Sequence, residues 1–315
     1  MSTVSVHIVT FNSEADIRAC LAAVFRQTVP VQSIIVVDNA STDGTRAVLC
    51  EYADGVQLVL NEQNRGFAGG HNQALALSDA DFCLILNPDV TLSDEYIERL
   101  LAGVRLSDDI GSATGLLLRR ERPETVDSTG LVISRTRRAF DRGAEDPAAA
   151  WTASGEVFGV SGAAALYARR MVADISIDGE FFDEDFFAYK EDVDVAWRAR
   201  LAGWKAYYAA EATAVHGRGW KIGGRSKQSL RVRRLSYINR YKMLIKNERG
   251  YGLIRHLLPL IGYELLGFAY FALREPAVLG AWLTVPRQWR QLLHKRRSIQ
   301  SKVCISAAEL YHWFK

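Results

Sequence analysis

The segment Phe82-Cys-Leu-Ile-Leu-Asn-Pro-Asp-Val90 gives the clearest indication of the class of fold. Its apolar run, Phe82 to Leu86, is too short for a helix and predicts a buried strand. Pro88 has no backbone N–H to donate, so it should end the pairing of that strand. Asn87 and Asp89 are therefore expected at the carboxyl end of a core strand, where open α/β sheets bind ligands.

Predicted strands and helices alternate on the N-terminal side of this segment. Strands are expected at residues 4–10, 33–38 and 56–60. A helix is expected where Ile17, Leu21, Val24 and Phe25 recur at helical spacing, and two more at about residues 41–52 and 66–78. Ser13 followed by Asp16 resembles a capping box at the start of the first helix. The alternation predicts a parallel sheet with helices on both faces, so roughly the first 100 residues should form a nucleotide-binding type of α/β half.

The rest of the chain divides into a second α/β part and a helical tail. Residues 113–167 show short strands around an Arg-rich loop, and we expect a mixed-sheet insertion that shapes a second pocket. A helix should begin near Glu191 and stop at Gly203, and a strand at residues 204–208 with the segment to His216 should close the sheet. The predicted domains are an α/β domain at 1–220, with halves at 1–110 and 111–220, and a basic, mostly helical region at 221–315.

Charge is distributed unevenly along the chain. With 315 residues and 49% hydrophobic content it can bury a sizeable core, which excludes a disordered protein. Residues 217–315 carry 20 Lys/Arg against 4 Asp/Glu, an excess of 16 positive charges, whereas residues 1–216 have an excess of 13 negative charges. A basic tail of this kind suits anionic lipid headgroups or a nucleic acid.

Cysteine usage and the N-terminus fit a reducing compartment. The four cysteines lie far apart and form no C-x-x-C pair, so neither a zinc site nor a disulfide framework is indicated. The strand-like residues 4–10 are not preceded by the basic start of a signal peptide, so export is not expected.

Two loops near the predicted strand ends could bind a nucleotide. Asp38 ends a strand, where a carboxylate can accept hydrogen bonds from a base or a ribose hydroxyl. Alternatively, Asp38, Ser41 and Asp43 merely cap the next helix. Residues 64–72 place small residues at a helix start that favours phosphate, or they are ordinary turn glycines. They do not form G-x-G-x-x-G, so a dinucleotide oxidoreductase is not supported.

Four acidic residues and one histidine could bind a metal ion or accept a proton. Asp89 offers hard oxygen ligands that suit Mg²⁺ or Mn²⁺ against a diphosphate leaving group, but Asn-Pro-Asp is also a common turn. His216 could be a second ligand or a structural histidine. Glu191-Asp-Val-Asp194 places carboxylates in the first turn of a helix, where the dipole stabilises them in any protein. One that faces a pocket could also take the proton from a sugar hydroxyl.

Taken together, these motifs resemble the family 2 glycosyltransferases with a GT-A fold, and most closely their rhamnosyltransferase-like branch. The resemblance covers roughly residues 4–220 and implies a Rossmann-like mixed α/β sheet flanked by helices. The matching segments stand in the expected order: Val9-Thr-Phe-Asn12, Val36-Val-Asp-Asn-Ala-Ser-Thr-Asp43, Asn64-Arg-Gly-Phe-Ala-Gly-Gly70, Leu86-Asn-Pro-Asp89, Val160-Ser-Gly-Ala-Ala164, Phe186-Phe-Ala-Tyr-Lys-Glu-Asp-Val-Asp194 with Trp197-Arg198, and His216.

The resemblance also implies roles for individual residues. Asp38 would read the pyrimidine base, and the full set at the nucleotide-sugar site would be Thr10, Asn12, Asp38, Asn39, Ser41, Asn64, Gly66, Phe67 and Asn87. Asp89 and His216 would hold Mg²⁺ or Mn²⁺ at the place of the family's D-x-D motif. In this sequence Asn87 stands at the position of the first aspartate of that motif. Asp192 would be the general base with Glu191 beside it. The acceptor-side residues would be Ser161, Gly162 and Asp194.

The implied reaction is an inverting displacement, which needs one base and no enzyme nucleophile. The expected donor is dTDP-L-rhamnose, and the expected acceptor is a hydroxyl of a polyprenyl-linked glycan or a polysaccharide. UDP-galactofuranose or another UDP-hexose is an alternative donor. A non-catalytic, membrane-bound saccharide-binding protein is disfavoured because both Asp89 and Asp192 are present. A nucleotidyltransferase is disfavoured because no Gly-rich, basic N-terminal loop for a triphosphate is found.

The basic tail contains a strongly apolar segment at residues 257–273. Because it includes Pro259 and Glu264 and a spanning helix wants ~20 mostly apolar residues, we expect a helix that lies in the membrane interface. Basic residues at 231–246 and 295–297 would contact an anionic membrane surface, or the tail would be a set of solvated helices that cover the sheet. Nucleic acid is not expected, since no recognised nucleic-acid motif is found. The predicted location is peripheral, on the cytoplasmic face of the inner membrane. The sequence does not decide whether the protein forms a homo-oligomer.

Overall fold

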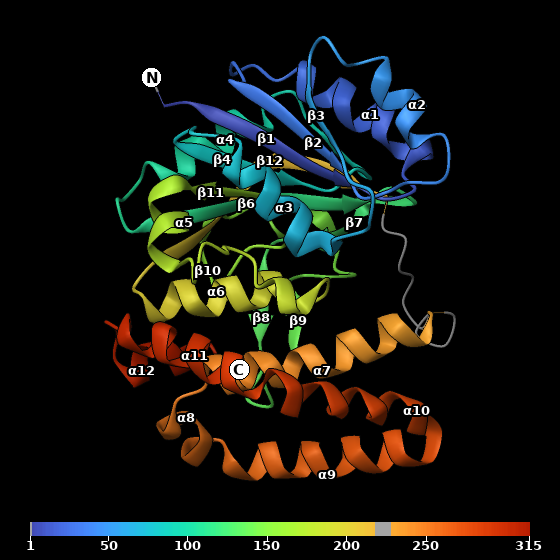
Figure 1. Cartoon of the computed structure of the whole chain (residues 1–315). Helices are drawn as coiled ribbons and strands as arrows, with labels where there is room; N and C mark the ends of the chain where they lie inside the picture. Colours follow the sequence, from blue (N-terminus) through green and yellow to red (C-terminus); the bar gives the residue numbers. More distant parts are fainter. Residues whose placement is uncertain (1, 218–227) are drawn as a thin grey trace.

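A computed structural model describes residues 2–217 and 228–315. Figure 1 shows an α/β part with a twisted sheet and, below it, a layer of C-terminal helices, with α9 farthest from the sheet. The predicted boundary between residues 220 and 221 lies outside the described residues. The strands are β1 Val4–Thr10, β2 Ser33–Asp38, β3 Gln57–Leu60, β4 Phe82–Leu86, β5 Val90–Leu92, β6 Ile110–Arg119, β7 Arg122–Ser128, β8 Leu131–Ile133, β9 Ala139–Asp141, β10 Gly155–Val157, β11 Ala164–Ala168 and β12 Lys205–His216.

Within the described residues, ten of these strands form one mixed sheet with β10-β12-β6-β11-β4-β1-β2-β3 as its main order. β1, β2, β3 and β4 are parallel, as predicted, and β11 runs antiparallel to β4. The expected insertion at residues 113–167 is therefore wrong in part, because β6 and β11 are central strands that continue the same sheet. The short β8–β9 hairpin alone forms a separate two-stranded sheet. The strand predicted at residues 204–208 also continues without a break to His216 as β12.

β4 shows how the sequence builds two cores around one sheet. Successive side chains of a strand point to opposite faces. Phe82, Leu84 and Leu86 accordingly join the cluster beneath α1 and α4, whereas Cys83 and Ile85 join the cluster beneath α3, α5 and α6. A strand with both faces buried needs the continuous apolar run that predicted it.

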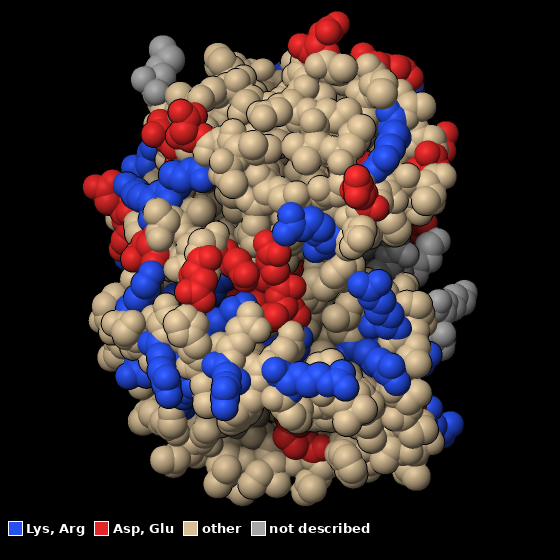
Figure 2. All heavy atoms as spheres, viewed as in Figure 1, with Lys and Arg blue, Asp and Glu red and all other residues tan. Residues whose placement is uncertain are grey.

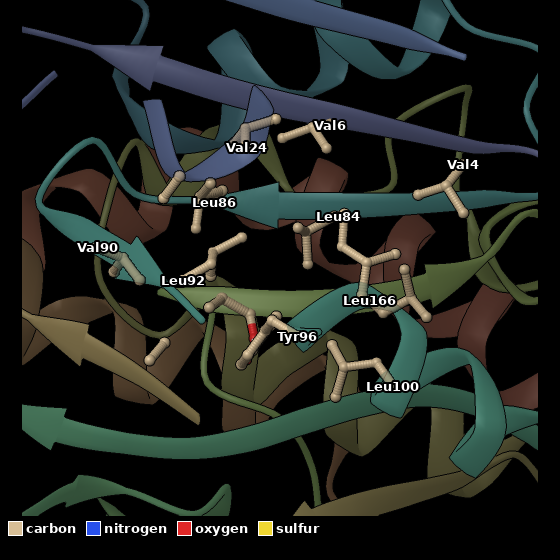
Figure 3. Packing of buried hydrophobic residues seen from close by; sticks show 14 of the residues in the cluster. Val4, Val6, Val24, Leu84, Leu86, Val90, Leu92, Tyr96, Leu100 and Leu166 are labelled. Carbon is tan, nitrogen blue, oxygen red and sulfur yellow. The ribbon is translucent and has the colours of Figure 1, made fainter. Parts of the chain in front are cut away.

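The first of these cores is drawn in Figure 3, where Leu84, Leu86 and Leu166 from the sheet point toward Tyr96 and Leu100. Tyr96 is fully buried, and its hydroxyl donates to the carbonyl oxygen of Ala164 at 2.9 Å. Burial of this hydroxyl therefore leaves no unpaired donor, which would otherwise cost free energy.

Helices cover both faces of the sheet, as predicted. α6 ends where Gly203 adopts a positive φ of 83°, which glycine accommodates without a side-chain clash. The capping box at Ser13 is wrong, because Ser13 makes no cap to α1 and its hydroxyl accepts from the N–H of Phe11 instead. The helices of the α/β part are α1 Glu14–Phe25, α2 Thr45–Cys50, α3 Gly66–Ala76, α4 Tyr96–Val104, η1 Ala148–Ala150, α5 Arg169–Ile175, η2 Glu184–Phe186 and α6 Glu191–Leu201.

Six α-helices and a 3₁₀ turn make up the described C-terminal region. Together with α6, this layer buries Met243, Ile299 and Tyr311 against Trp197. The elements are α7 Leu230–Asn247, α8 Gly250–Arg255, α9 Leu257–Arg274, α10 Pro276–Leu279, η4 Gly280–Leu283, α11 Thr284–Ser301 and α12 Ala307–His312.

Several basic residues of this region point inward rather than toward solvent. Lys246 is fully buried and pairs with Asp183 and with Asp194, and Lys295 lies 2.6 Å from another oxygen of Asp183. Lys242 is also buried and donates to the carbonyl oxygen of Asp185 at 2.7 Å. Figure 2 shows this join, with acidic side chains gathered directly above a row of basic ones. The expectation that these three lysines face lipid headgroups is therefore wrong, because the α/β part supplies their counter-charges.

α9 lies on the outside of this layer. By length and composition alone it is the one helix, among the residues described, that could cross a membrane. Leu260 is its single buried residue, whereas Leu258, Leu266 and Leu273 are 82%, 75% and 82% exposed. Soluble monomers rarely expose apolar patches of this size without a function for them.

Candidate active site

The main cavity lies at the carboxyl ends of β1, β2 and β4, where the segment around Asp89 was expected to place its ligands. Its volume is about 590 Å³, within the range of whole-ligand pockets, which is roughly 300–1,000 Å³. Its walls combine predicted residues with parts of the 187–189 loop and of α7. The predicted residues that line it are Thr10, Asn12, Asn39, Asn64, Gly66, Phe67, Asn87 and Asp89.

Asp38 lies beneath this cavity and is fully buried. Its carboxylate accepts hydrogen bonds from Thr10 at 2.9 Å, from the hydroxyl and the N–H of Ser41, and from Arg46 at 2.6 Å. Burial alone would raise the pKa of Asp38, but these hydrogen bonds outweigh it and the pKa is lowered. Asp38 thus carries a stable negative charge that fixes the two loops above it, and its role as base reader stays a prediction.

Asparagines shape the rim of the cavity. Asn12 adopts a positive φ of 54°, which asparagine tolerates better than most residues, and its side-chain oxygen accepts from the N–H of Thr42. Asn39 donates to the carbonyl oxygen of Gly66 at 2.9 Å, and Asn64 accepts from the N–H of Gly66 at 2.7 Å. These contacts hold the start of α3 in place, so the backbone can approach a ligand there.

Gly66 is required by both its conformation and its surroundings. Its φ is 74°, and a Cβ atom added there would lie 2.3 Å from the carbonyl oxygen of Phe187. Since L side chains rarely adopt this conformation and the blocking atom belongs to the backbone, only glycine fits.

The 187–190 loop, which faces Gly66, is held by α7. Phe187, Tyr189 and Lys190 all have positive φ values between 61° and 76°. Asn239 on α7 is fully buried, and its amide lies 2.9 Å from the carbonyl oxygens of Phe186, Ala188 and Tyr189. The C-terminal region therefore completes the site: it braces this loop, and its Arg231, Val232 and Leu235 line the cavity.

Asp89 and His216 meet at the edge of the cavity, as the resemblance implied. His216 Nε2 lies 3.3 Å from Asp89 Oδ1, and His216 Nδ1 lies 2.8 Å from Asp127 Oδ2. Burial alone would lower the pKa of His216, but the two carboxylates raise it to about 9. Burial alone would raise the pKa of Asp89, but the hydrogen bond and charge of His216 lower it.

This arrangement fits a divalent cation. Metal-binding histidines usually donate their second ring N–H to a carboxylate, and Asp127 is the acceptor that would leave Nε2 free to bind metal beside Asp89. Among the residues that the structure describes, no three His, Cys, Asp or Glu side chains are placed so that they could hold a metal ion together. In phosphate-binding enzymes, Mg²⁺ is usually held by one or two protein ligands, and phosphate oxygens and water molecules supply the remaining ligands.

Glu191 and Asp192 are the first two residues of α6. The N–H of Gly162 donates to Asp192 Oδ2 at 3.3 Å, and a Cβ atom added at Gly162 would lie 3.2 Å from the ring of Phe67. Burial raises the pKa of Asp192, while the nearby Lys190 opposes the rise. Burial and the charge of Asp192 raise the pKa of Glu191 to about 8, and Glu191 Oε2 has no hydrogen-bond partner among the described residues. A carboxylate with a raised pKa is a stronger base, as proton abstraction requires.

The three predicted acceptor-side residues separate in the structure. Gly162 contacts Asp192, and Ser161 is buried beside it at the start of β11. Asp194 points the other way: it is fully buried, and its oxygens accept from Arg198 at 2.9 Å and from Asn247 at 2.7 Å. It lines neither described cavity, and its predicted contact with an acceptor stays untested.

Sequence reasoning missed Asp127, Arg46 and Asn239. Asp127 follows an exposed strand start in β7 and carries no local motif, so only the register of β6 with β7 and β12 brings it to His216. Arg46 lies eight residues after Asp38, which ends its strand. This spacing could have indicated Arg46 as a partner of the Asp38 carboxylate.

A mixed sheet with a carboxylate after β4, a cavity at its edge and helices on both faces is the architecture of the GT-A fold. Residues 5–120 match the model of the family described as glycosyl transferase family 2. Over 238 residues the chain is 26% identical to N-acetylglucosaminyl-diphospho-decaprenol L-rhamnosyltransferase of Mycobacterium tuberculosis, covering 68% of this chain and 76% of that protein.

Solved structures share the fold at low sequence identity. GalNAc-T7 with UDP, GalNAc and Mn²⁺ superposes with a TM-score of 0.61 and 14% identity over 78% of this chain, which matches 48% of that one. The mannosyltransferase PcManGT of Pyrobaculum calidifontis, in complex with GDP-Man and Mn²⁺, gives a TM-score of 0.57 and 17% identity over 96% of this chain and 86% of that one. The predicted fold class is thereby confirmed.

Proposed function

We propose that this glycosyltransferase moves L-rhamnose from dTDP-rhamnose, with inversion, to a hydroxyl of a polyprenyl-linked or polysaccharide acceptor in bacterial cell-surface glycan synthesis. The observation that carries the proposal is the Asp89–His216 pair at the edge of the main cavity, which Asp89 helps to line. Displacement at a sugar carbon needs a partner for the leaving diphosphate and a base for the acceptor hydroxyl, and the proposal assigns the second role to Asp192. The choice of rhamnose rests on the named activity of the mycobacterial relative.

The residues of the chain would divide the work as follows. Asp89 and His216 would hold Mg²⁺ or Mn²⁺, which stabilises negative charge on a diphosphate leaving group. Thr10, Asn12 and Asp38 with its partners would position the nucleoside. Asp192 would take the proton from the acceptor hydroxyl as its oxygen bonds to the anomeric carbon and the bond to the diphosphate oxygen breaks.

A donor panel tests this proposal. The purified chain is incubated with dTDP-rhamnose, UDP-galactofuranose, UDP-glucose or UDP-N-acetylglucosamine, with Mg²⁺ or Mn²⁺, and with a polyprenyl diphosphate N-acetylglucosamine acceptor. Transfer is read from the mass of the product. Exclusive or strongly preferred transfer of a deoxyhexose is expected, and preferred transfer from a UDP-sugar would replace rhamnose with that sugar.

A UDP-sugar donor is the alternative inside the class. The neighbour GalNAc-T7 is described with UDP, and PcManGT with GDP-mannose, so the fold accepts several nucleotides. A non-catalytic saccharide-binding protein is the alternative from another class. It predicts saccharide binding without turnover for every donor of the panel.

We also propose that the protein docks peripherally on the cytoplasmic face of the inner membrane through α9. Its exposed leucines would enter the interface, while Arg255 and Arg274 near its ends would meet anionic headgroups. Binding to anionic liposomes at low salt tests this, and a protein that stays unbound and fractionates as soluble would contradict it. A homo-oligomer stays a prediction that size-exclusion chromatography with light scattering can test.

A further inference from the structure

A second, smaller cavity lies between the β8–β9 hairpin, α7 and α9. Its volume is about 210 Å³, below the roughly 300–1,000 Å³ of pockets that hold whole ligands, so it suits one group of a larger molecule. The residues that line it are Arg137, Arg138, Ala139, Phe140, Lys190, Ser236, Tyr237, Arg240, Tyr241, Tyr263, Gly267 and Phe271. Four of these are cationic side chains, and none is acidic.

Two of the four cations already have carboxylate partners. Arg137 pairs with Glu248 at 2.6 Å, and Arg240 pairs with Glu264 at 2.7 Å. Both are buried, at 0% and 8% exposure, yet Arg137 Nη2 and Arg240 Nε have no hydrogen-bond acceptor among the residues described. Buried donors without a partner are costly, so a ligand oxygen would improve this site.

The other two cations have no ion pair to a carboxylate within the described part of the chain. Arg138 rests on the rings of Phe140 and Tyr263 at 4.5 and 5.8 Å, and Lys190 is acted on by the charges of Asp192, Asp141 and Glu191, none of which lines the cavity. The wall of the cavity itself therefore presents cationic side chains and no acidic one. A diphosphate group carries a matching negative charge and the oxygens that the buried guanidinium groups lack.

The position of the cavity relates it to the acceptor rather than the donor. Tyr189 and Leu235 line the main cavity, while the next residues in the chain, Lys190 and Ser236, line the second one. The two cavities are thus neighbours across a single layer of loop and helix. Lys190 is also close enough to oppose the rise in the pKa of Asp192.

On its outer side the cavity adjoins apolar surface. Tyr263, Gly267 and Phe271 belong to α9, whose next turns expose Leu266, Phe268 and Leu273. From Asp192 toward the protein surface, the groups follow in this order: the proposed base, the cationic side chains, the aromatic wall of the second cavity and the exposed apolar helix α9. This is the order of groups in a molecule with a sugar hydroxyl, a diphosphate and a long hydrocarbon chain.

We infer that this cavity binds the diphosphate of a lipid-diphosphate-linked acceptor, with Arg138 and Lys190 as its principal contacts and the hydrocarbon chain along α9. The inference rests on the proposed glycosyl transfer for its sugar, but the binding of the diphosphate does not require turnover. Membrane phospholipids also carry phosphate, and the experiment separates the two sources.

Binding of farnesyl diphosphate to the full chain is measured by calorimetry with dTDP and Mn²⁺ saturating the main cavity. Arg138→Gln and Lys190→Gln should each weaken it about tenfold, because each removes one charge-assisted contact. Arg105→Gln is the matched control, since Arg105 is exposed directly after α4 and lines neither cavity. Unchanged farnesyl diphosphate binding in both variants would overturn the inference.

Two further arms assign the source and the relation to catalysis. Vesicles of phosphatidylcholine with phosphatidylglycerol should bind Arg138→Gln as well as the wild type; loss of vesicle binding with intact farnesyl diphosphate binding would assign the cations to membrane headgroups and overturn the inference. In transfer assays, Arg138→Gln should raise KM about tenfold for a lipid-diphosphate acceptor but not for a phosphate-free alkyl glycoside. If no donor supports turnover, the binding arms still decide, so the site and the proposed function fail separately.

Discussion

Asp127 holds His216 in line with Asp89: its carboxylate lies 2.8 Å from His216 Nδ1, and the opposite nitrogen lies 3.3 Å from Asp89. Asp127 is fully buried on β7. It is far from His216 in the sequence, but in the structure it lies directly behind the ring of His216. Because one carboxylate occupies Nδ1, the ring presents Nε2 toward the cavity. The histidine is thus oriented before any ligand arrives.

Asp127→Asn tests this orientation. The amide oxygen can still accept from Nδ1–H, but the negative charge that makes Nε2 a better ligand is lost. We expect Mn²⁺ affinity in the presence of UDP to fall about 10- to 100-fold. Calorimetry with Asp108→Asn as an exposed control checks this, and an affinity within twofold of the wild type would show that His216 does not bind metal.

Asp192→Asn should remove the base without altering the donor cavity. Asp192 contacts Gly162 rather than the nucleotide-side loops, so nucleotide affinity should stay within about twofold. Turnover should fall about 10²- to 10⁴-fold, the usual contribution of a general base. Steady-state kinetics and nucleotide titration of the same preparation measure both, and full activity would remove Asp192 from the mechanism.

The fold could be predicted where the determinants are local. The strands at residues 4–10, 33–38 and 82–86 have their predicted bounds. At 33–38 and 82–86, burial on both faces leaves an almost continuous apolar run in the sequence, whereas at 4–10 apolar residues alternate with the buried polar residues Ser5 and His7. Residues 113–167 were misplaced because the polar and small residues that line β6, such as Ser112 and Thr114, hide a central strand.

The site could be predicted only in part for a related reason. Polar residues at the end of a strand can be recognised from the local sequence. Asp127, the partner of His216, is 89 positions away from it and is brought there by the register of the strands. The same holds for Asn239 and for the lysines of α7 and α11, whose acidic partners lie in the α/β part. Two of the basic residues that suggested a membrane-facing tail, Lys246 and Lys295, instead balance the charge of Asp183.

Gly66→Ala should damage the fold and the donor cavity together. The residue has a φ of 74°, and the new Cβ would meet the carbonyl oxygen of Phe187 at 2.3 Å. We expect a loss of about 2–4 kcal/mol in the free energy of unfolding, with weaker nucleotide binding. Gly155→Ala is the control, because nothing lies within 4 Å of its added Cβ. Equal urea midpoints for the two variants would contradict the argument.

Lys246→Met should loosen the join between the C-terminal helices and the α/β part. It leaves buried Asp183 and Asp194 with one cation fewer, although Lys295 and Arg198 remain beside them. Breaking a buried pair costs about 3–5 kcal/mol when no partner remains, so a loss of about 3 kcal/mol is expected here. Arg18→Met, which breaks the exposed pair with Glu51, should change the urea midpoint little. A similarly small change for Lys246→Met would mean that the buried charges do not stabilise the join.

Glu191 makes stability depend on pH in a direction opposite to that of most carboxylates. Its pKa is raised from 4.5 to about 8, so the folded state keeps a proton that the unfolded state releases. The free energy of unfolding should therefore fall as pH rises from about 5 to 8 on account of this group, with the full cost present above pH 8. Glu191→Gln has no such titration, because its amide does not ionise.

The stability gained by Glu191→Gln should accordingly be small at pH 5 and grow to about 1–3 kcal/mol at pH 8. Urea unfolding of wild type and variant at pH 5, 6.5 and 8 measures this difference. Glu62→Gln, an exposed substitution, should follow the wild type at each pH. If Glu191→Gln also follows the wild type at every pH, Glu191 is ionised in the folded protein, and the acidic pair at the start of α6 holds two charges rather than one.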